Sequence, residues 1–306
     1  MPKYNPKQFA DVKPWVITAV VEEDQRDTKS MWAGETSAME CQQSRLQRIN
    51  FLRKQNSSPA VAVANRLESC KTTFRCLSGA CPECGRLFQR WLVRKSKDVI
   101  ANHVAMPGKA LVSVTIAPTS NLVPPGQLQK FSISDLHRRF KWAMNKFNLG
   151  PAFGGVDFSF NEDRDRSFAP VWSVHAYIIS ATPAREQLQK SLRDWFKETN
   201  PIHRNVVRPV KVSRFTNDAY RRSYALKMHF ERRISYREVK IQNGKKRICR
   251  NTSSDKLRAQ ERLELFLYLD HIGLAQRVIL SGLRAFGDGN DGVKLRPWGK
   301  VHRING

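Results

Sequence analysis

The residues with the clearest potential for chemistry are Tyr220, Tyr224 and Lys227, which follow one another at positions i, i+4 and i+7. A helix over this stretch places all three side chains along one stripe. A tyrosine oxygen can attack a phosphodiester and form a phosphotyrosine bond, and a neighbouring ammonium can balance the charge on the phosphorus centre. The alternative interpretation is an amphipathic helix whose tyrosines only pack against a sheet.

Asp157 and His175 lie in two stretches, 153–160 and 171–180, that alternate between apolar and polar residues. Alternation places both on the polar side of their strands, opposite the side expected to face the core. If the strands are neighbours, the carboxylate and the imidazole can share a divalent ion such as Mg²⁺ or Mn²⁺. Such an ion polarises and orients a scissile phosphate, which completes the residue set of a nickase. The alternative is the ordinary polar side of a half-exposed sheet.

Four of the six cysteines lie close together with the spacing C-x5-C-x4-C-x2-C, namely Cys70, Cys76, Cys81 and Cys84. Four thiolates complete a tetrahedral zinc site and leave no position open for water, so we expect a structural Zn²⁺ ion. Buried cysteines without a ligand, or redox chemistry at the last two, are the alternatives.

The composition restricts the class of partner. The 306 residues include 53 Lys and Arg against 27 Asp and Glu, a formal net charge of +26, which favours binding to nucleic acid. A hydrophobic content of 41% excludes a mostly disordered chain. Without an apolar run of about 20 residues or a secretory signal, we expect a cytoplasmic protein with reduced cysteines and no membrane partner.

Strands and helices alternate from residue 110 onward. The predicted strands cover 110–116, 153–160, 171–180 and 206–212, and the predicted helices cover 132–147, 183–197 and 217–230. The order β-α-β-β-α-β predicts a ferredoxin-like α+β fold, with an antiparallel sheet and two helices on one face. Residues 255–286 are predicted to be helical, with a weak point at Gly273.

The chain is predicted to have five parts: a polar, partly helical arm (1–65), a cysteine-rich zinc-like module with a basic helix (66–106), a catalytic core (107–232), a basic hairpin with a helical extension (233–286) and a basic tail (287–306). Asn243-Gly244 between two alternating runs predicts the hairpin. Its nine Lys or Arg against two Glu between residues 227 and 250 predict contacts with a phosphate backbone. A second predicted contact is the basic helix, through Arg86, Arg90, Arg94 and Lys95.

Four stretches together resemble the HUH-type rolling-circle replication initiators of plasmids and small phages. LVSVTIAP at 111–118 looks like the first motif, WSVHAYI at 172–178 like the metal-binding second motif, and YRRSYALK at 220–227 like the nucleophile helix. VDFSFN at 156–161 resembles the strand that carries an acidic ligand in relatives. The second motif departs from the family, because Ser173 stands where the first of two histidines is usual.

This resemblance implies a metal-dependent tyrosine DNA endonuclease and strand transferase that initiates rolling-circle replication. It would nick and rejoin single-stranded DNA at an origin through a 5′-phosphotyrosine, with Tyr224 as first nucleophile and Tyr220 as second. Its partners would be single-stranded and origin DNA, a host polymerase and, because no G-x-x-x-x-G-K-[ST] motif is present, a host helicase. A rolling-circle transposase and a non-catalytic zinc-containing DNA- or RNA-binding protein remain alternatives, although Tyr177 alone is a poor base-stacking platform.

Overall fold

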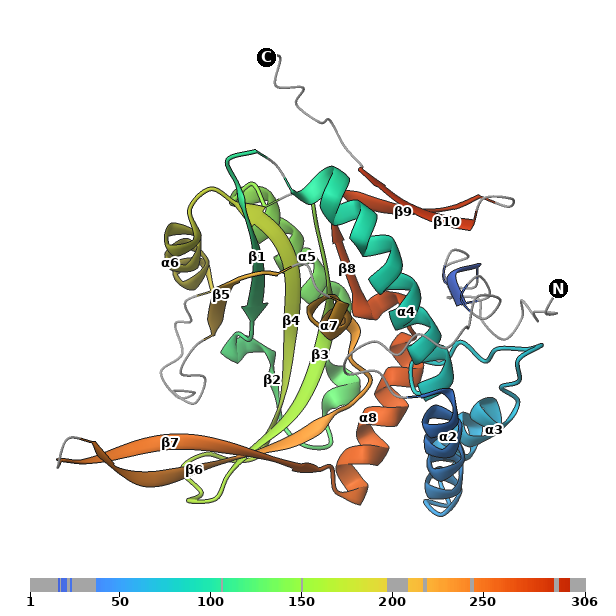
Figure 1. Cartoon of the computed structure of the whole chain (residues 1–306). Coiled ribbons are helices and arrows are strands. Elements are labelled where there is room, and N and C mark those ends of the chain that lie inside the picture. The colour runs from blue at the N-terminus through green and yellow to red at the C-terminus, as the bar shows by residue number, and fades with distance from the viewer. Residues whose placement is uncertain are drawn as a thin grey trace.

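A mixed β-sheet lies at the centre of the structure, a computed structural model (Figure 1). The structure describes residues 16, 18–20, 23, 37–105, 107–149, 151–196, 209–216, 219–242, 245–288 and 292–297. The strands are β1 (Ala110–Ile116), β2 (Leu122–Val123), β3 (Ala152–Asp163), β4 (Val171–Thr182), β5 (Val210–Arg214), β6 (Glu231–Gln242), β7 (Lys245–Lys256), β8 (Val278–Ser281), β9 (Leu283–Asp288) and β10 (Gly292–Pro297). The helices are α2 (Ala38–Arg53), α3 (Ser58–Glu68), α4 (Pro82–Val99), α5 (Ile133–Lys146), α6 (Arg185–Trp195), α7 (Ala219–Ser223), α8 (Ala259–Ile272) and the 3-10 turn η6 (Tyr224–Leu226).

The sheet has eight strands, with the order β5-β1-β4-β3-β6-β7 along its main path. β1 pairs antiparallel with β5 and β4, and β4 pairs antiparallel with β3. β3 then pairs in parallel with β6 along one part of its length and antiparallel with β8 along another, which makes the sheet mixed. The predicted α+β class is therefore confirmed.

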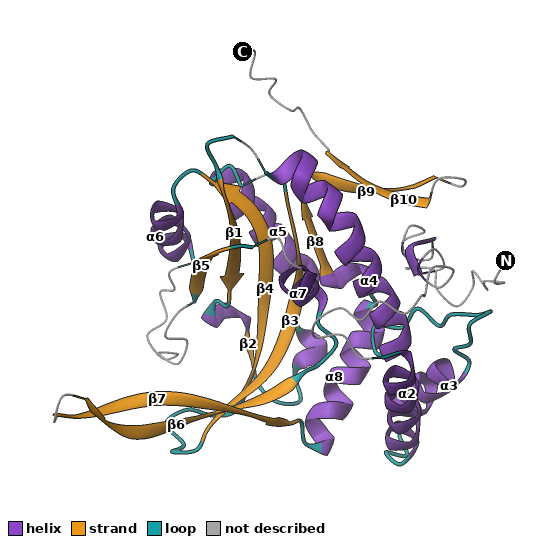
Figure 2. Ribbon diagram, in the orientation of Figure 1, coloured by secondary structure: helices purple, strands orange, loops and turns teal. Residues whose placement is uncertain are grey.

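The two faces of the sheet differ as the alternation predicts. On one face the apolar side chains of β1, β3 and β4 are buried, among them Val114, Phe158 and Trp172. α5 supplies a buried apolar stripe that includes Leu136 and Phe140. Figure 2 shows α5 behind the sheet and α7 in front of it, so the polar face lies toward α7.

The N-terminal helices form a second layer beside the sheet (Figure 1). α2 begins at a capping box, in which Ser37 and Glu40 bond to each other's backbone N–H groups. α4 begins directly after Cys81, with Pro82 in its first turn. Asp270 of α8 ties this layer to the core, because it accepts hydrogen bonds from Arg66 at 2.9 Å and Ser78 at 2.5 Å.

The predicted helix over 217–230 is wrong in its length. Residues 217 and 218 lie outside the described residues, and the helix ends after α7 and η6, before β6 begins. The carbonyl of Ser223 accepts a hydrogen bond from Gln89, and that of Lys227 accepts one from Arg277, each at 2.7 Å. Side chains of other elements thus donate hydrogen bonds to carbonyl groups that would accept backbone hydrogen bonds in a longer helix.

The predicted helical extension over 255–286 is also wrong in its second half. α8 ends at Ile272, where Gly273 adopts a φ of +66° that favours glycine. The chain then forms β8, which pairs with β3, and β9, which pairs with β10. Part of the predicted tail is therefore a strand of a small hairpin, while residues 289–291 and 298–306 lie outside the described residues.

Three of the four basic residues of α4 that were predicted to contact DNA, all but the half-buried Lys95, are buried or form ion pairs within the protein. Arg86 and Arg90 are buried, and Arg90 and Arg94 both form ion pairs with the fully buried Glu23. Arg90 and Arg94 instead fix α4 against a segment of the predicted N-terminal arm. Within the part of the chain that the structure describes, no helix is long and apolar enough to cross a membrane.

Candidate active site and metal centre

Asp157, His175 and Lys227 meet on the polar face of the sheet. Asp157 of β3 and His175 of β4 are direct partners in the antiparallel register, as their positions in the sequence predict. His175 Nε2 lies 3.0 Å from Asp157 Oδ2, and Lys227 Nζ lies 2.9 Å from the same oxygen. The carboxylate therefore joins an imidazole and an ammonium from two distant segments.

Asp157 is held as a carboxylate. Its side chain is 3% exposed, and burial alone opposes its ionisation. The charges and hydrogen bonds of His175 and Lys227 outweigh burial and hold the pKa of Asp157 well below its usual range. The site thus keeps one fixed negative charge between two basic side chains at neutral pH.

The two tyrosines of the third motif have different surroundings. Tyr224 is half-buried and packs its ring against Tyr177, with ring centroids 5.2 Å apart. Lys227 Nζ lies 5.5 Å from the centre of the Tyr224 ring, so this tyrosine belongs to the same group as Asp157. Tyr220 is 52% exposed. The structure therefore brings Tyr224 and Lys227 together, and leaves Tyr220 on the solvent side of α7.

Helix α4 supports the segment that carries these residues. Gln89 donates a hydrogen bond to the carbonyl of Ser223, next to Tyr224. Gly85 lies so close to Met228 that a Cβ at residue 85 would be 2.1 Å from Met228 Cε. The first turns of α4, which follow directly on Cys81, thus position the predicted nucleophile.

Arg277 is a site residue that the sequence did not indicate. It is 1% exposed, and its guanidinium donates to the carbonyl of Lys227 at 2.7 Å and reaches the carbonyl of Val156 at 3.5 Å. Burial lowers its pKa to about 10, although the charge of Asp157 acts in the opposite direction. Arg277 fixes the backbone on both sides of the Asp157–Lys227 pair. It lies in a stretch predicted to be helical, and its local sequence carries no signal of this role.

The four clustered cysteines meet as the spacing predicts. All four are buried, and their sulfur atoms lie within 4.8 Å of one another. Three of the separations are 3.6, 3.8 and 3.8 Å. A tetrahedron with sulfur atoms about 2.3 Å from a zinc ion has edges of about 3.8 Å, so the residues fit a metal such as zinc.

The charges around the cysteine cluster also fit a metal bound by thiolates. Hydrogen bonds within the cluster lower the pKa of Cys70 and raise those of Cys76 and Cys84. Two arginines face the cluster: burial lowers the pKa of Arg48 to about 10, while Arg45 is held by a 2.7 Å ion pair with Glu83. A zinc ion with four thiolates carries a double negative charge, which the positive charge of the buried Arg48 partly offsets.

The predicted divalent site at Asp157 and His175 has fewer protein ligands. Among the described residues, only the cysteine cluster brings three or more potential ligands together. Ser173, which stands at the first histidine position of the motif that the sequence resembles, lies on the same face as His175 and is buried. Lys227 occupies one side of the Asp157 carboxylate, where it supplies positive charge.

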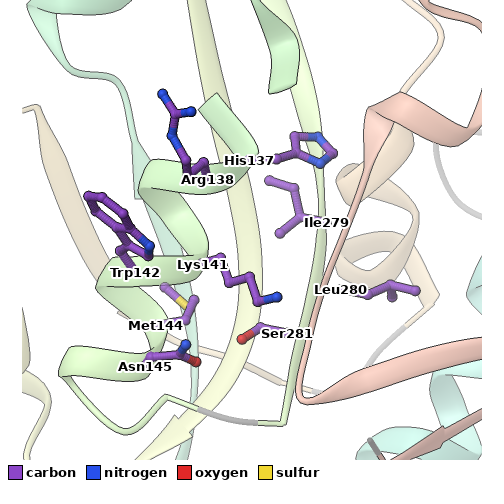
Figure 3. A pocket seen from close by; sticks show the side chains of 9 residues that line it. All are labelled: His137, Arg138, Lys141, Trp142, Met144, Asn145, Ile279, Leu280 and Ser281. Carbon is purple, nitrogen blue, oxygen red and sulfur yellow. The ribbon is translucent and has the colours of Figure 1, made fainter. Parts of the chain in front are cut away.

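A separate cavity of about 390 Å³ lies between α5 and β8 (Figure 3). Six of its lining residues come from α5, among them His137, Lys141 and Trp142, and residues 279–281 line the side formed by β8. Neither Asp157 nor Tyr224 lines it, so the cavity is not part of the candidate active site.

The interpretation of the site rests on its own geometry. No protein-family model, no curated protein and no solved structure matches the chain.

Proposed function

We propose that this protein is a tyrosine DNA nickase that cuts and rejoins single-stranded DNA at a replication origin. The observation that carries the proposal is the meeting of Asp157 with Tyr224 and Lys227, which lie together in a segment far from Asp157 in the sequence. Hydrophobic contacts alone can hold two such segments together. A buried ion pair beside a tyrosine is not needed for that purpose, and such pairs are frequent at functional sites.

In the proposed reaction, the Tyr224 oxygen attacks the phosphorus atom of a phosphodiester. A P–O bond to tyrosine forms and the P–O3′ bond breaks, so the 5′ end becomes a phosphotyrosine. The phenol loses a proton to solvent, and the departing 3′ oxygen gains one. Lys227, which lies against the Tyr224 ring, offsets the charge on the non-bridging phosphate oxygens. Attack by the freed 3′ hydroxyl in reverse rejoins the strand.

Asp157 positions Lys227 in this scheme, and it would also be one ligand of a divalent ion. His175 and Asp157 are the residues that would hold Mg²⁺ or Mn²⁺, which supplies Lewis-acid polarisation of the phosphate. Lys227 would have to release Asp157 and turn toward the phosphate for these two residues to hold such an ion. The cysteine cluster, with four thiolates, has the composition of a structural zinc site.

The strand order supports a ferredoxin-like core. β5-β1-β4-β3 are all antiparallel, and α5 and α6 connect them in the order β-α-β-β-α-β. With the sequence resemblance to HUH initiators, this favours a role in rolling-circle replication with origin DNA, a host helicase and a host polymerase. A rolling-circle transposase shares the chemistry, and the DNA that surrounds its target would distinguish it.

The proposal is tested by nicking of single-stranded DNA from the protein's own replicon with Mn²⁺ or Mg²⁺. We expect cleavage by the wild type and by Tyr236→Phe, a half-buried tyrosine away from the site, but not by Tyr224→Phe. Full cleavage by Tyr224→Phe overturns the assignment. DNA binding without cleavage by the wild type favours a non-catalytic zinc-containing protein.

A further inference from the structure

The hairpin formed by β6 and β7 extends beyond the sheet that anchors it (Figures 1 and 2). The two strands pair along their whole length, but β6 pairs with β3 only through Arg232–Ser235. From Tyr236 to Gln242 the hairpin continues without that support. Seven residues at about 3.3 Å each give a projection of roughly 23 Å.

The base of this projection is fixed to the end of β3 and to the loop that follows it. Arg250 lies 3.8 Å from Asp163, and its guanidinium lies 5.2 Å from the centre of the Phe168 ring. The guanidinium of Arg164 stacks on Tyr236 at 5.0 Å. These contacts give the hairpin a defined direction relative to the sheet.

The outer part of the hairpin carries a cluster of exposed apolar side chains. Val239 is 60% exposed, Ile241 74% and Ile248 73%. Val239 and Ile248 are direct partners in the antiparallel register, and Ile241 is two residues along the same strand, so all three share one face. Clustered apolar side chains on a projecting element mark an interaction site.

Basic residues surround this apolar cluster on the same face. Lys246 is the register partner of Ile241, and Arg250 is the register partner of Arg237, which precedes Val239 by two residues. All three basic residues are exposed. A binding partner that matches this face must therefore have negative charges on its surface, for the basic residues, and apolar groups within reach of the three apolar side chains. Duplex DNA has this combination, with phosphates outside and stacked bases inside.

The shape of the hairpin fits the same partner. The major groove of DNA is wide enough for a two-stranded β-ribbon. β-Ribbons also enter the minor groove, and from there apolar side chains inserted between base steps unstack them and kink the duplex. Val and Ile are compact and stiff at χ1, which suits a wedge.

We propose that the tip of the β6–β7 hairpin binds duplex DNA and unstacks base pairs with Val239, Ile241 and Ile248. The step requires no nucleotide and no covalent chemistry, because binding energy offsets the cost of unstacking. It goes beyond the proposed nicking reaction and does not depend on it. If both activities are present, the opened duplex supplies the single strand that Tyr224 cuts.

The test uses the full-length protein with Tyr220→Phe and Tyr224→Phe, so that cleavage plays no part. Duplex oligonucleotides that tile the protein's own replicon carry 2-aminopurine, whose fluorescence rises when it unstacks, and a terminal dye reports binding by anisotropy. The wedge variant is Val239→Thr, Ile241→Thr and Ile248→Thr, which keeps β-branched residues and hence the strand propensity. The matched control is Val61→Thr, an exposed valine of α3.

We expect the parent protein to raise 2-aminopurine fluorescence on at least one duplex by about threefold at saturation, and the control to match it. The wedge variant should lose most of this rise while its Kd changes by less than about tenfold, because the basic residues remain. Circular dichroism verifies that the variant is folded. Binding with no fluorescence rise in the parent, an undiminished rise in the wedge variant, or the absence of duplex binding each overturns the proposal. In the last case the apolar tip would instead serve a protein partner.

Discussion

The cysteine cluster predicts one tightly bound zinc ion and a specific pattern of thiol reactivity. The chain has six cysteines, of which four form the cluster, Cys41 is buried elsewhere and Cys249 is half-buried on the hairpin. With zinc bound, we expect only Cys249 to react rapidly with a thiol reagent. Removal of the metal should expose the four ligands, so five thiols should react.

Removal of the zinc ion should also affect the structure of the candidate active site. α4 follows directly on Cys81, and its Gly85 and Gln89 contact the segment that carries Tyr224. Structural zinc contributes about 10–16 kcal/mol in zinc-finger peptides. If only a quarter of that stabilises the native chain, about 3 kcal/mol is lost with the metal, which lowers Tm by about 6–12 °C.

The assay combines metal analysis, thiol titration and thermal unfolding of wild type, Cys76→Ser and Cys249→Ser. Cys76→Ser should lose zinc and stability together. Cys249→Ser should lose only the fast thiol and keep one zinc ion per chain. Five rapidly reacting thiols in zinc-supplemented wild type, or unchanged zinc content in Cys76→Ser, would refute the reasoning.

Three further predictions concern the sheet, the helix contact and the hairpin. Asp157→Asn should cost about 3 kcal/mol of unfolding free energy near pH 7. Because the folded-state pKa is lowered, this difference should be complete above the unfolded-state pKa of about 4 and should shrink progressively as the pH falls below it, as thermal unfolding across pH can show. Gly85→Ala should lower the free energy of unfolding by about 1 kcal/mol, measured as a lower urea midpoint, because its Cβ meets Met228; an unchanged midpoint contradicts this contact. Removing the charges of Lys246 and Arg247 should flatten the salt dependence of DNA binding by about two units of slope, and an unchanged slope excludes phosphate contact.

The sequence predicted the strand pair that holds the site, because alternation is a local property. The polar positions of β3 and β4 place Asp157 and His175 on one face, and the antiparallel register then brings them opposite each other. The cysteine spacing was equally informative, since short loops keep four ligands within reach of one another.

The remaining contacts depend on tertiary structure that no local pattern encodes. The i, i+4, i+7 spacing predicted one helical stripe, whereas Lys227 reaches Asp157 from extended chain after the helix ends. Arg277 ends that helix from a distant segment. The basic helix α4 was predicted to contact DNA because the ion-pair partner of Arg90, Glu23, lies 67 residues earlier and no local pattern indicates that pairing.

The central claim is that Tyr224 becomes covalently linked to DNA, and peptide mapping of the adduct tests it most directly. Wild-type protein is incubated with single-stranded DNA from its own replicon and Mn²⁺, denatured, digested with nuclease and protease, and analysed by mass spectrometry. We predict a nucleotide attached through phosphate to Tyr224, with none on Tyr236. An adduct that forms on Tyr220 alone, or cleavage without any adduct, would contradict the account.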